Sequence, residues 1–445
     1  MKIAILGGGF TGLAAGYHLA KKGHNVVIFE KERQLGGLAS GFKSDSWDWV
    51  LERAYHHLFH SDDDILNFAK NIGFNDIFFQ EPETSSLYKE INPTSPRILG
   101  APLGASNYRI IPIDTPQDFL KFPFLSMPEK LRSAMVLAFL KFSPYFSLYE
   151  KQTAKEFLKK TMGKNVWNVL WQELFRKKFG KYAENIVAAF IWARINKRTK
   201  KLGYVRGGFQ HFIDYIADTN SKQGVEIRKG VAVSEIMKIA ATFVVNEEHF
   251  DAVISTLPTP VLTKITNNLF PQTYIKRLQK LQYLHALNLI LETDNPFIEK
   301  TYWLSVCVKE LPFMVVVQHS NFIDKQYYGG KHITYVAKYI DMDDKLLKMN
   351  KEEVLDYWLP HLRKIFNFPC NKLQGKQFSI FNSYLFKGPF AQPIFDKEFV
   401  KNKPDFETPI KNFYIANLDM TYPYDRGTNY AVKLGREVSK LIGSH

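Results

Sequence analysis

Three glycines near the N-terminus have the spacing of a dinucleotide-binding turn. Gly7, Gly9 and Gly12 follow the apolar run KIAIL. The segment TGLAAGYHLAKKG, which contains Gly12, has the pattern of a helix packed on a sheet. The first glycine permits a tight turn, the second lets the backbone approach a pyrophosphate, and the third allows close helix–strand packing. The pyrophosphate would lie at the helix N-terminus, where unpaired N–H groups favour negative charge. The alternative is a glycine-rich turn without a ligand.

A carboxylate follows at the distance expected for a ribose contact. The next apolar run, NVVIFE, ends at Glu30, eighteen residues beyond Gly12. Its carboxylate could accept hydrogen bonds from ribose hydroxyls and would repel a 2′-phosphate, which disfavours NADP. A second glycine pair, Gly36 and Gly37, then stands in KERQLGGLAS, where a nicotinamide dehydrogenase would continue with further strand–helix units.

KERQLGGLAS resembles the extended motif of FAD-binding oxidoreductases, which runs along the pyrophosphate and ribityl chain. The whole chain resembles the superfamily of amine oxidases, protoporphyrinogen oxidases and phytoene desaturases, and most nearly its bacterial protoporphyrinogen-oxidase-like branch. The resemblance implies an FAD-dependent oxidoreductase, an oxidase or dehydrogenase that takes hydride from a small organic substrate. Leu38 departs from the amine oxidase branch, which often has arginine there, and the active-site lysine of that branch has no obvious match.

The resemblance also covers the middle and the end of the chain. VAVSEI matches a Val-x-x-Ile segment of the superfamily in which the valine touches the adenine. FDAVISTLPTPVL matches the strand that closes the nucleotide domain. NFYIANLDMTYPYDRGTNYAVKLGREVSKLI matches the last flavin-contacting unit, the alternative being a plain terminal helix. The implied FAD contacts are Gly7, Gly8, Gly9, Gly12, Leu13, Glu30, Lys31, Gly36, Gly37, Leu38, Ala39, Val233, Asn417, Thr428, Asn429 and Tyr430.

The segment ERAYHHLFHSDDD contains three histidines, His56, His57 and His60. Their spacing fits no metal site and no cysteine accompanies them, so we expect no metal. They are either satisfied structural histidines or neighbours of the flavin, where a histidine could tune the ring. HLFHSDD is similar to a flavin-adjacent segment of UDP-galactopyranose mutases, which use reduced FAD without net electron transfer. A flavin-dependent UDP-sugar mutase is therefore the alternative function, and a protein that keeps FAD for structure or sensing is a third.

Aromatic and cationic residues supply the remaining candidates. An aromatic wall could form over the flavin, although packing alone would also explain these residues: Tyr302, Trp303, His319, Tyr335 and Tyr339. Arg194 and Arg198 fall four apart on one helix face and, with Arg426, could clamp a carboxylate or diphosphate. Exposed or structurally paired arginines are the alternative. We take His57, His60, Tyr335 and Arg426 as catalytic candidates, and Arg194, Arg198, Tyr302, Trp303, His319 and Tyr339 as substrate-binding candidates.

Composition limits the class of protein. A chain of 445 residues is too long for one core, and 45% hydrophobic with 23% charged residues describes a globular protein. The net charge is +15, with basic clusters at 175–181 and 194–201 and no nucleic-acid motif, so they are either solvated lysine-rich helix faces or a surface for an anionic substrate or membrane. Cys307 and Cys370 form no CxxC, which favours a reducing compartment. We expect a cytoplasmic enzyme without a signal peptide or spanning helix, with peripheral membrane contact through 119–150. The sequence does not fix the oligomeric state.

The fold class that follows is α/β, with a Rossmann-like FAD-binding domain interlocked with a substrate domain of mixed sheet and helices. The FAD-binding domain would be discontinuous, formed by 1–75, 203–262 and 405–445. Residues 76–202 and 263–404 would form the substrate domain, with 115–202 mainly helical. Strands are predicted at 285–293, 313–319 and 332–340, and a helix at 350–366.

Overall fold

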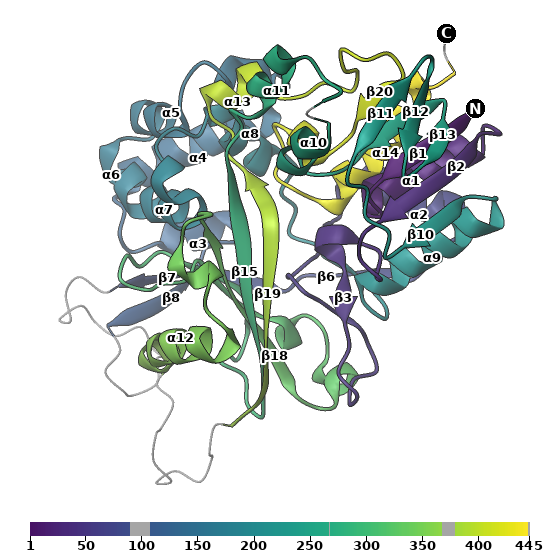
Figure 1. Cartoon of the computed structure of the whole chain (residues 1–445). Helices are drawn as coiled ribbons and strands as arrows, with labels where there is room; N and C mark the ends of the chain where they lie inside the picture. Colours follow the sequence, from purple (N-terminus) through teal and green to yellow (C-terminus); the bar gives the residue numbers. More distant parts are fainter. Residues whose placement is uncertain (90–106, 267, 367–378, 444–445) are drawn as a thin grey trace.

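A five-stranded parallel sheet forms the part of the protein that holds both termini (Figure 1). The structure is a computed structural model that describes residues 1–89, 107–266, 268–366 and 379–443. The strand order is β10 (Glu226–Lys229), β2 (Asn25–Glu30), β1 (Lys2–Leu6), β14 (Ala252–Ser255) and β20 (Phe413–Ile415). Every neighbouring pair is parallel, as a Rossmann-like fold requires.

Both faces of this sheet are buried, which explains the continuous apolar runs of its strands. Ile3 and Ile5 pack on the same side as α1 (Phe10–Ala20), α9 (Phe209–Lys222) and α14 (Thr428–Leu441). Ala4 and Leu6 point the other way, toward a small antiparallel sheet. That sheet is formed by β11 (Ile236–Ile239), β12 (Thr242–Val245) and β13 (Glu248–Phe250).

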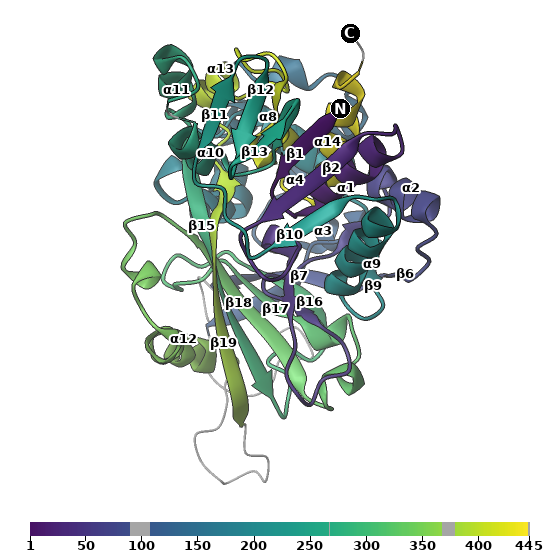
Figure 2. The same cartoon turned by 45° about the vertical axis from the view of Figure 1, so that its right-hand side comes forward.

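A seven-stranded sheet forms the second part of the molecule, in the lower half of Figure 2. Its order is β19 (Ile380–Pro393), β15 (Tyr283–Thr293), β18 (His332–Ile340), β17 (Val315–Gln318), β16 (Thr301–Val306), β7 (Glu83–Lys89) and β8 (Tyr108–Pro112). The pairing is antiparallel except between β16 and β7. One face packs on α12 (Lys351–Phe366), and the other contributes to the core shared with α1 and α9. The predicted strands and helix of this part are therefore present.

A layer of helices lies beside the large sheet, at the upper left of Figure 1. It comprises α3 (Pro116–Lys121), α4 (Met127–Phe142), α5 (Ala154–Thr161), α6 (Lys164–Val166), the π-helix η3 (Trp167–Trp171), α7 (Gln172–Phe179) and α8 (Ala188–Lys197). The prediction of a mainly helical segment at 115–202 agrees with these bounds. None of the helices in the described residues combines the length and apolar character needed to cross a bilayer.

Short elements connect the parts. Strand β3 (Gly41–Phe42) pairs with β4 (Leu51–Glu52), and β9 (Leu202–Val205) pairs with β5 (Leu58–Phe59) and β6 (Ile77–Gln80). The remaining helices are α2 (Asp63–Ile72), α10 (Thr259–Ile265), α11 (Gln272–Leu278) and α13 (Lys397–Asn402). The strands of the parallel sheet come from all three stretches assigned to the FAD-binding domain, while the domain boundaries themselves stay a prediction. Cys307 is buried as a free thiol, and Cys370 lies outside the described residues.

Candidate functional site

Two glycine loops meet at the carboxyl end of the parallel sheet. Gly7 and Gly36 have φ of +108° and +115°, a region that disfavours residues with a Cβ. The Gly36 N–H donates to the Gly8 carbonyl over 2.9 Å, which joins the loops. A Cβ at Gly12 would come within 2.0 Å of the Gly7 carbonyl oxygen, whereas one at Gly9 would meet no atom closer than 3.9 Å. The backbone is therefore tight beneath the turn and open above it, as a cradle for a pyrophosphate must be.

Glu30 is fixed beside this cradle. Its Oε2 accepts a hydrogen bond from the Gly8 N–H over 2.8 Å, and its Oε1 accepts one from the Glu32 N–H over 2.9 Å. Each carboxylate oxygen keeps a second lone pair with which a ribose hydroxyl could bond. The Val231 N–H donates to the Glu30 carbonyl, which brings the loop that carries Val233 to the same end of the strand. Lys31 and Leu38 are exposed at the rim, and Leu13 and Ala39 are buried below it.

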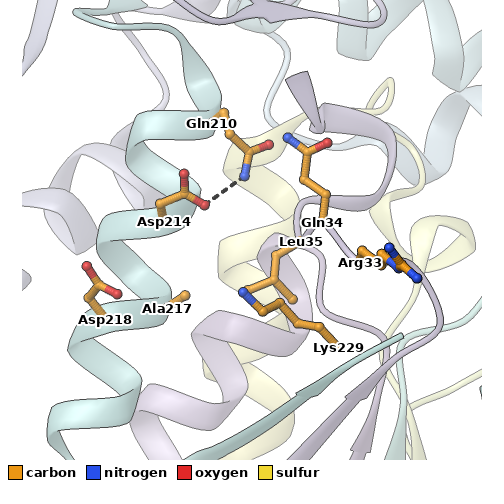
Figure 3. Close-up of a pocket in the computed structure, with 8 residues that line it drawn as sticks. All are labelled: Arg33, Gln34, Leu35, Gln210, Asp214, Ala217, Asp218 and Lys229. Carbon is orange, nitrogen blue, oxygen red and sulfur yellow. Dashed lines mark hydrogen bonds between the residues drawn. The ribbon is translucent and has the colours of Figure 1, made fainter. Parts of the chain in front are cut away.

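A separate hollow of about 310 Å³ lies next to the second glycine loop (Figure 3). Its lining comes from the loop at Arg33, from α9 and from the end of β10, and includes Asp214, Asp218 and Lys229. Gln210 closes one side by donating to Asp214 over 2.8 Å. None of the glycines of the turn lines this hollow, so it is distinct from the open side of the cradle.

The C-terminal unit places three of its predicted residues at the start of α14. Thr428 and Asn429 form the first turn of α14 and are buried, and Tyr430 stacks on Tyr424 with ring centres 4.6 Å apart. The Asn429 side-chain oxygen accepts a hydrogen bond from the Ile65 N–H in the first turn of α2. Asn429 therefore caps α2 from outside, in addition to any role toward the flavin.

The Asn417 side chain, expected to contact the flavin, forms hydrogen bonds within the protein. Its Nδ2 donates to the Leu257 carbonyl and to Thr259 Oγ1, and its Oδ1 accepts from the Asp419 N–H. Both amide hydrogens and one oxygen lone pair are thus used to hold the loop after β20 against the loop after β14. The flavin contact expected of Asn417 stays a prediction.

Two of the three histidines lie together, and the third is apart. His56 is held by the Ala54 carbonyl at 2.6 Å, and His57 Nδ1 lies 3.3 Å from the Tyr302 hydroxyl. Burial lowers the pKa of His56 to about 4 and that of His57 to about 3, so both imidazoles are neutral at physiological pH. His60 lies on the other side of β5, exposed and packed against Phe79, because the strand reverses the direction of its side chain. His60 thus lies apart from His57, and the catalytic role of each stays a prediction.

A bulge in β16 places two aromatic side chains on the same face of the large sheet. The register with β7 shifts between Thr301 and Trp303, so that Tyr302 and Trp303 both join the core on the nucleotide side instead of alternating. Trp303 lies across from Val317, which in turn lies across from Tyr335. The Trp303 ring packs edge-on against Tyr55, with ring centres 4.9 Å apart. Tyr339 lies four residues further along β18, and the aromatic wall that these rings would form over the flavin stays a prediction.

Tyr335 and His319 lie deeper, in a buried polar network around Glu52. The Glu52 carboxylate accepts hydrogen bonds of 2.7 Å from the Tyr204 hydroxyl and from the Phe209 N–H at the start of α9. The Tyr335 hydroxyl donates to the Glu52 carbonyl over 2.8 Å. Burial outweighs these hydrogen bonds and raises the pKa of Glu52 to about 7. His319 lies 2.9 Å from the Tyr328 hydroxyl and is fully buried, so it acts as a core histidine and not as a substrate ligand.

Two cationic side chains converge on the Asp425 carboxylate where the last loop meets the helical layer, and Arg426 follows Asp425 in the chain. Lys178 of α7 donates to Asp425 Oδ2 over 2.6 Å, and Arg194 of α8 lies 3.6 Å from the same oxygen. The Arg426 guanidinium lies 5.0 Å from the centre of the Tyr339 ring. Burial alone would lower the pKa of Arg426, but Tyr339, a neighbouring tyrosine and Asp425 outweigh it and the pKa is raised. Three positive charges thus lie near the single charge of Asp425, an arrangement suited to an anion.

Arg198 does not share a helix face with Arg194, contrary to the prediction. α8 ends at Lys197, and Arg198 has an extended backbone with φ of −62° and ψ of 131°. Its guanidinium therefore turns to Asp114 Oδ1 at 3.2 Å and Thr84 Oγ1 at 3.0 Å. Both Arg194 and Arg198 still act on His57, whose pKa they lower further after burial and His56. Arg194 therefore faces Asp425 while Arg198 faces Asp114, and the clamp of Arg194, Arg198 and Arg426 for an anion stays a prediction.

Lys178 and Glu52 were not predicted as site residues. Lys178 belongs to FRKKFGK, where Phe175 and Phe179 are buried at helical spacing, so one lysine of this run had to lie at the edge of the buried face. Glu52 has no comparable signal, because its partners Tyr204 and Phe209 are about 150 residues away along the chain. Among the described residues no group of histidine, cysteine, aspartate or glutamate side chains could hold a metal ion.

The chain matches the family described as flavin containing amine oxidoreductase over residues 10–442. A curated relative, a 4,4′-diapophytoene desaturase of Staphylococcus haemolyticus, is 53% identical over 51 residues, which is 12% of this chain and 10% of the relative. The match thus spans about a tenth of the length of that relative. A solved structure assigned as a protoporphyrinogen oxidase of Exiguobacterium sp. has a TM-score of 0.71 at 17% identity, covering 99% of this chain and 98% of the other. A reduced UDP-galactopyranose mutase has a TM-score of 0.72 at 15% identity, covering 99% and 95%.

A parallel sheet with two glycine loops at its carboxyl end, joined to a second, mixed sheet, fits a flavin-dependent oxidoreductase. The chain belongs to the family of flavin-containing amine oxidoreductases. The predictions of the superfamily, the α/β fold class, FAD as cofactor and an FAD-dependent oxidoreductase are confirmed by this membership and by the fold of the solved relatives.

Proposed function

We propose that the protein oxidises a small organic substrate that carries an anionic group, with FAD as the electron acceptor. The single observation behind this proposal is the convergence of Lys178 and Arg194 on Asp425, with Arg426 over the Tyr339 ring of the proposed aromatic wall. An excess of cationic groups at an aromatic surface favours a planar or unsaturated molecule with a carboxylate, sulfate or phosphate.

The residues of the cradle fit FAD. Gly9 and Gly37 leave open backbone for the pyrophosphate, Glu30 is placed for the ribose, and the start of α14 lies at the far end of the same sheet edge. Bound FAD would supply a two-electron acceptor for hydride from the substrate. The protein would contribute orientation and charge: the cationic group binds the anion, and the aromatic wall excludes water from the reacting carbon.

Neutral His57 is proposed to form a hydrogen bond beside the flavin. Its depressed pKa keeps the imidazole neutral and weakly basic at neutral pH, and its Nδ1 contact with the Tyr302 hydroxyl orients the ring. Tyr335 is committed to Glu52 and is proposed to position the wall without touching the substrate.

The test is a visible spectrum of the purified protein, followed by anaerobic reduction with dithionite and exposure to air. Flavin bands that bleach and recover within seconds would support an oxidase, and slow recovery would support a dehydrogenase with another acceptor. A panel of aromatic carboxylates, amines and unsaturated acids is then tested for reduction of the bound flavin. Protein that never binds flavin would refute the proposal.

A UDP-sugar mutase is the second candidate, favoured by one observation. The segment that resembles the mutases places His57 near both arginines, which could bind a diphosphate. In that case only the reduced protein would bind a UDP-sugar tightly, no oxidant would be consumed, and Arg194→Gln would abolish binding. Oxidation of a substrate with stoichiometric consumption of an acceptor would exclude this candidate.

We also propose a cytoplasmic location with contact to the inner face of a membrane. The support for membrane contact is an exposed apolar helix face with basic edges in the segment 119–150.

A further inference from the structure

A continuous apolar stripe lies on the exposed side of the helical layer. Seven large side chains, each between 55% and 83% exposed, form the α4 stripe: Met127, Leu131, Met135, Phe139, Phe142, Tyr145 and Leu148. Successive residues advance by about 100° around a helix, so the five members within α4 occupy an arc of about 120°. The other side of α4 is buried through Ser133 and Leu140. The helix thus has two apolar sides, and the described residues of this chain cover one of them.

Basic residues border the stripe on both sides. By the same rotation, Lys130 and Lys141 lie along one edge and Arg132 lies along the other. Their side chains are held there: Lys130 donates to the Leu120 carbonyl, and Arg132 donates to the Lys160 carbonyl, each over 2.7 Å. Residues 119–151 contain five Lys or Arg against two Glu.

One of these two glutamates is already engaged. Glu129 forms the capping box with Ser126 and accepts a hydrogen bond from Asn165, which leaves it at the first turn of the helix. The edges of the stripe are therefore positive along most of its length.

The stripe is a rigid platform because α4 is fixed to α8. Lys141 donates to the carbonyls of Asn196 and Arg198 over 2.8 and 3.0 Å, and the Asn196 amide returns a bond of 2.9 Å to the Lys141 carbonyl. Trp192 donates to the Ser143 carbonyl over 2.8 Å directly beyond the helix. These contacts fix α4 and the residue that follows it to α8.

We propose that the α4 stripe docks the protein onto an anionic membrane surface, with α4 lying in the plane of the interface. The apolar side chains would enter the boundary between headgroups and acyl chains, and the bordering lysines and arginine would meet anionic headgroups. A second copy of this chain fits less well, since a two-fold contact would bring the same positive edges against each other. The inference deepens the membrane contact proposed above and does not depend on the redox reaction.

The test is flotation of the full-length, flavin-loaded protein with lipid vesicles. Vesicles of phosphatidylcholine alone are compared with vesicles that also contain phosphatidylglycerol, at low and at high salt. We expect binding to the anionic vesicles that weakens with salt, and a loss of about tenfold or more in Phe139→Ser/Phe142→Ser. The matched control is Met237→Ser/Met342→Ser, which removes exposed apolar side chains outside the stripe and should bind like the wild type.

Three results would overturn the proposal. The wild type could fail to float with anionic vesicles, or the stripe variant could float equally well. Light scattering could instead show a dimer that Phe139→Ser/Phe142→Ser converts to a monomer, which would assign the stripe to self-association. The flavin absorbance of the same samples is measured as well. Protein that contains flavin but does not float would refute only the docking. Protein that floats without flavin would refute only the redox function.

Discussion

Lys178 and Asp425 form a partly buried ion pair, with the ammonium donating to Asp425 Oδ2 over 2.6 Å, in the group proposed to bind the substrate anion. Burial lowers the pKa of Lys178 to about 8, although Asp425 opposes the shift. The pKa of Asp425 is lowered, because Lys178 and Arg194 outweigh its burial. Asp425 therefore stays ionised, and Lys178 is the member of the group that titrates just above neutral pH.

The first prediction follows from this titration. As the pH rises through about 8, Lys178 loses its proton and the net positive charge of the group falls, so affinity for an anionic ligand should fall. We expect the dissociation constant of an aromatic carboxylate such as benzoate, read from the flavin spectrum, to rise several-fold above this pH. Lys178→Gln should bind weakly at all pH values without this step.

Lys177→Gln is the matched control for that experiment. Lys177 lies on the same helix and also has a pKa lowered by burial to about 8, but its ammonium bonds to the Leu311 carbonyl, away from Asp425. This variant should keep the pH dependence of the wild type. If it removed the dependence while Lys178→Gln preserved it, the assignment of Lys178 to the anion site would be wrong.

The second prediction concerns the glycine cradle. Gly12→Ala would place a Cβ within 2.0 Å of the Gly7 carbonyl oxygen, so the turn must open and its N–H groups must leave their positions. We expect the purified variant to have lost most of its flavin absorbance while remaining folded by circular dichroism. Gly23→Ala is the control, because a Cβ there meets nothing within 4 Å and only the backbone strain of about 1 kcal/mol remains. Full flavin content in Gly12→Ala would contradict the proposed pyrophosphate site.

The nucleotide half of the protein was predictable because its signals are local. The positions Gly7 to Glu30 form one continuous strand–turn–helix–strand unit, and its contacts involve backbone groups that the glycine spacing dictates. The seven-stranded sheet was anticipated only in its β15, β17 and β18 members. Strands β16 and β7 are parallel neighbours from distant parts of the chain, and no local pattern specifies such a pairing.

On the substrate side, sequence spacing did not predict how the candidate residues are arranged. Arg198 was placed on a helix face by its spacing, but α8 ends one residue earlier. His60 was grouped with His57 by proximity in sequence, but β5 separates their side chains. The period-two alternation of a strand would place Tyr302 and Trp303 on opposite faces of the sheet. They share one side only because of the bulge in β16.

The third prediction distinguishes a structural from a cofactor role at Asn417. Its amide makes three hydrogen bonds within the protein, so Asn417→Ala should lower the free energy of unfolding by about 2–4 kcal/mol. The effect should persist in protein from which flavin has been removed, as measured by urea unfolding. Asn429→Ala, which loses one bond to the Ile65 N–H, should cost about 1 kcal/mol in the same assay. Unchanged stability of flavin-free Asn417→Ala would return its side chain to the cofactor.

The fourth prediction concerns Glu52. Its carboxyl is fully buried, and its pKa is raised from 4.5 to about 7, by burial above all. Between these two values the folded protein holds a proton that the unfolded chain has released, so the contribution of Glu52 to stability falls as pH rises from about 4.5 to 7. The full difference corresponds to about 3 kcal/mol. Glu52→Gln can still accept from the Phe209 N–H and carries no charge, so it should be more stable than the wild type at pH 8 and similar at pH 4.5.

Urea unfolding at both pH values gives the comparison, and Asp45→Asn, a change at an exposed carboxylate, should leave the pH dependence of the wild type intact. If Glu52→Gln and the wild type differed by the same amount at both pH values, the proton would not be held at Glu52.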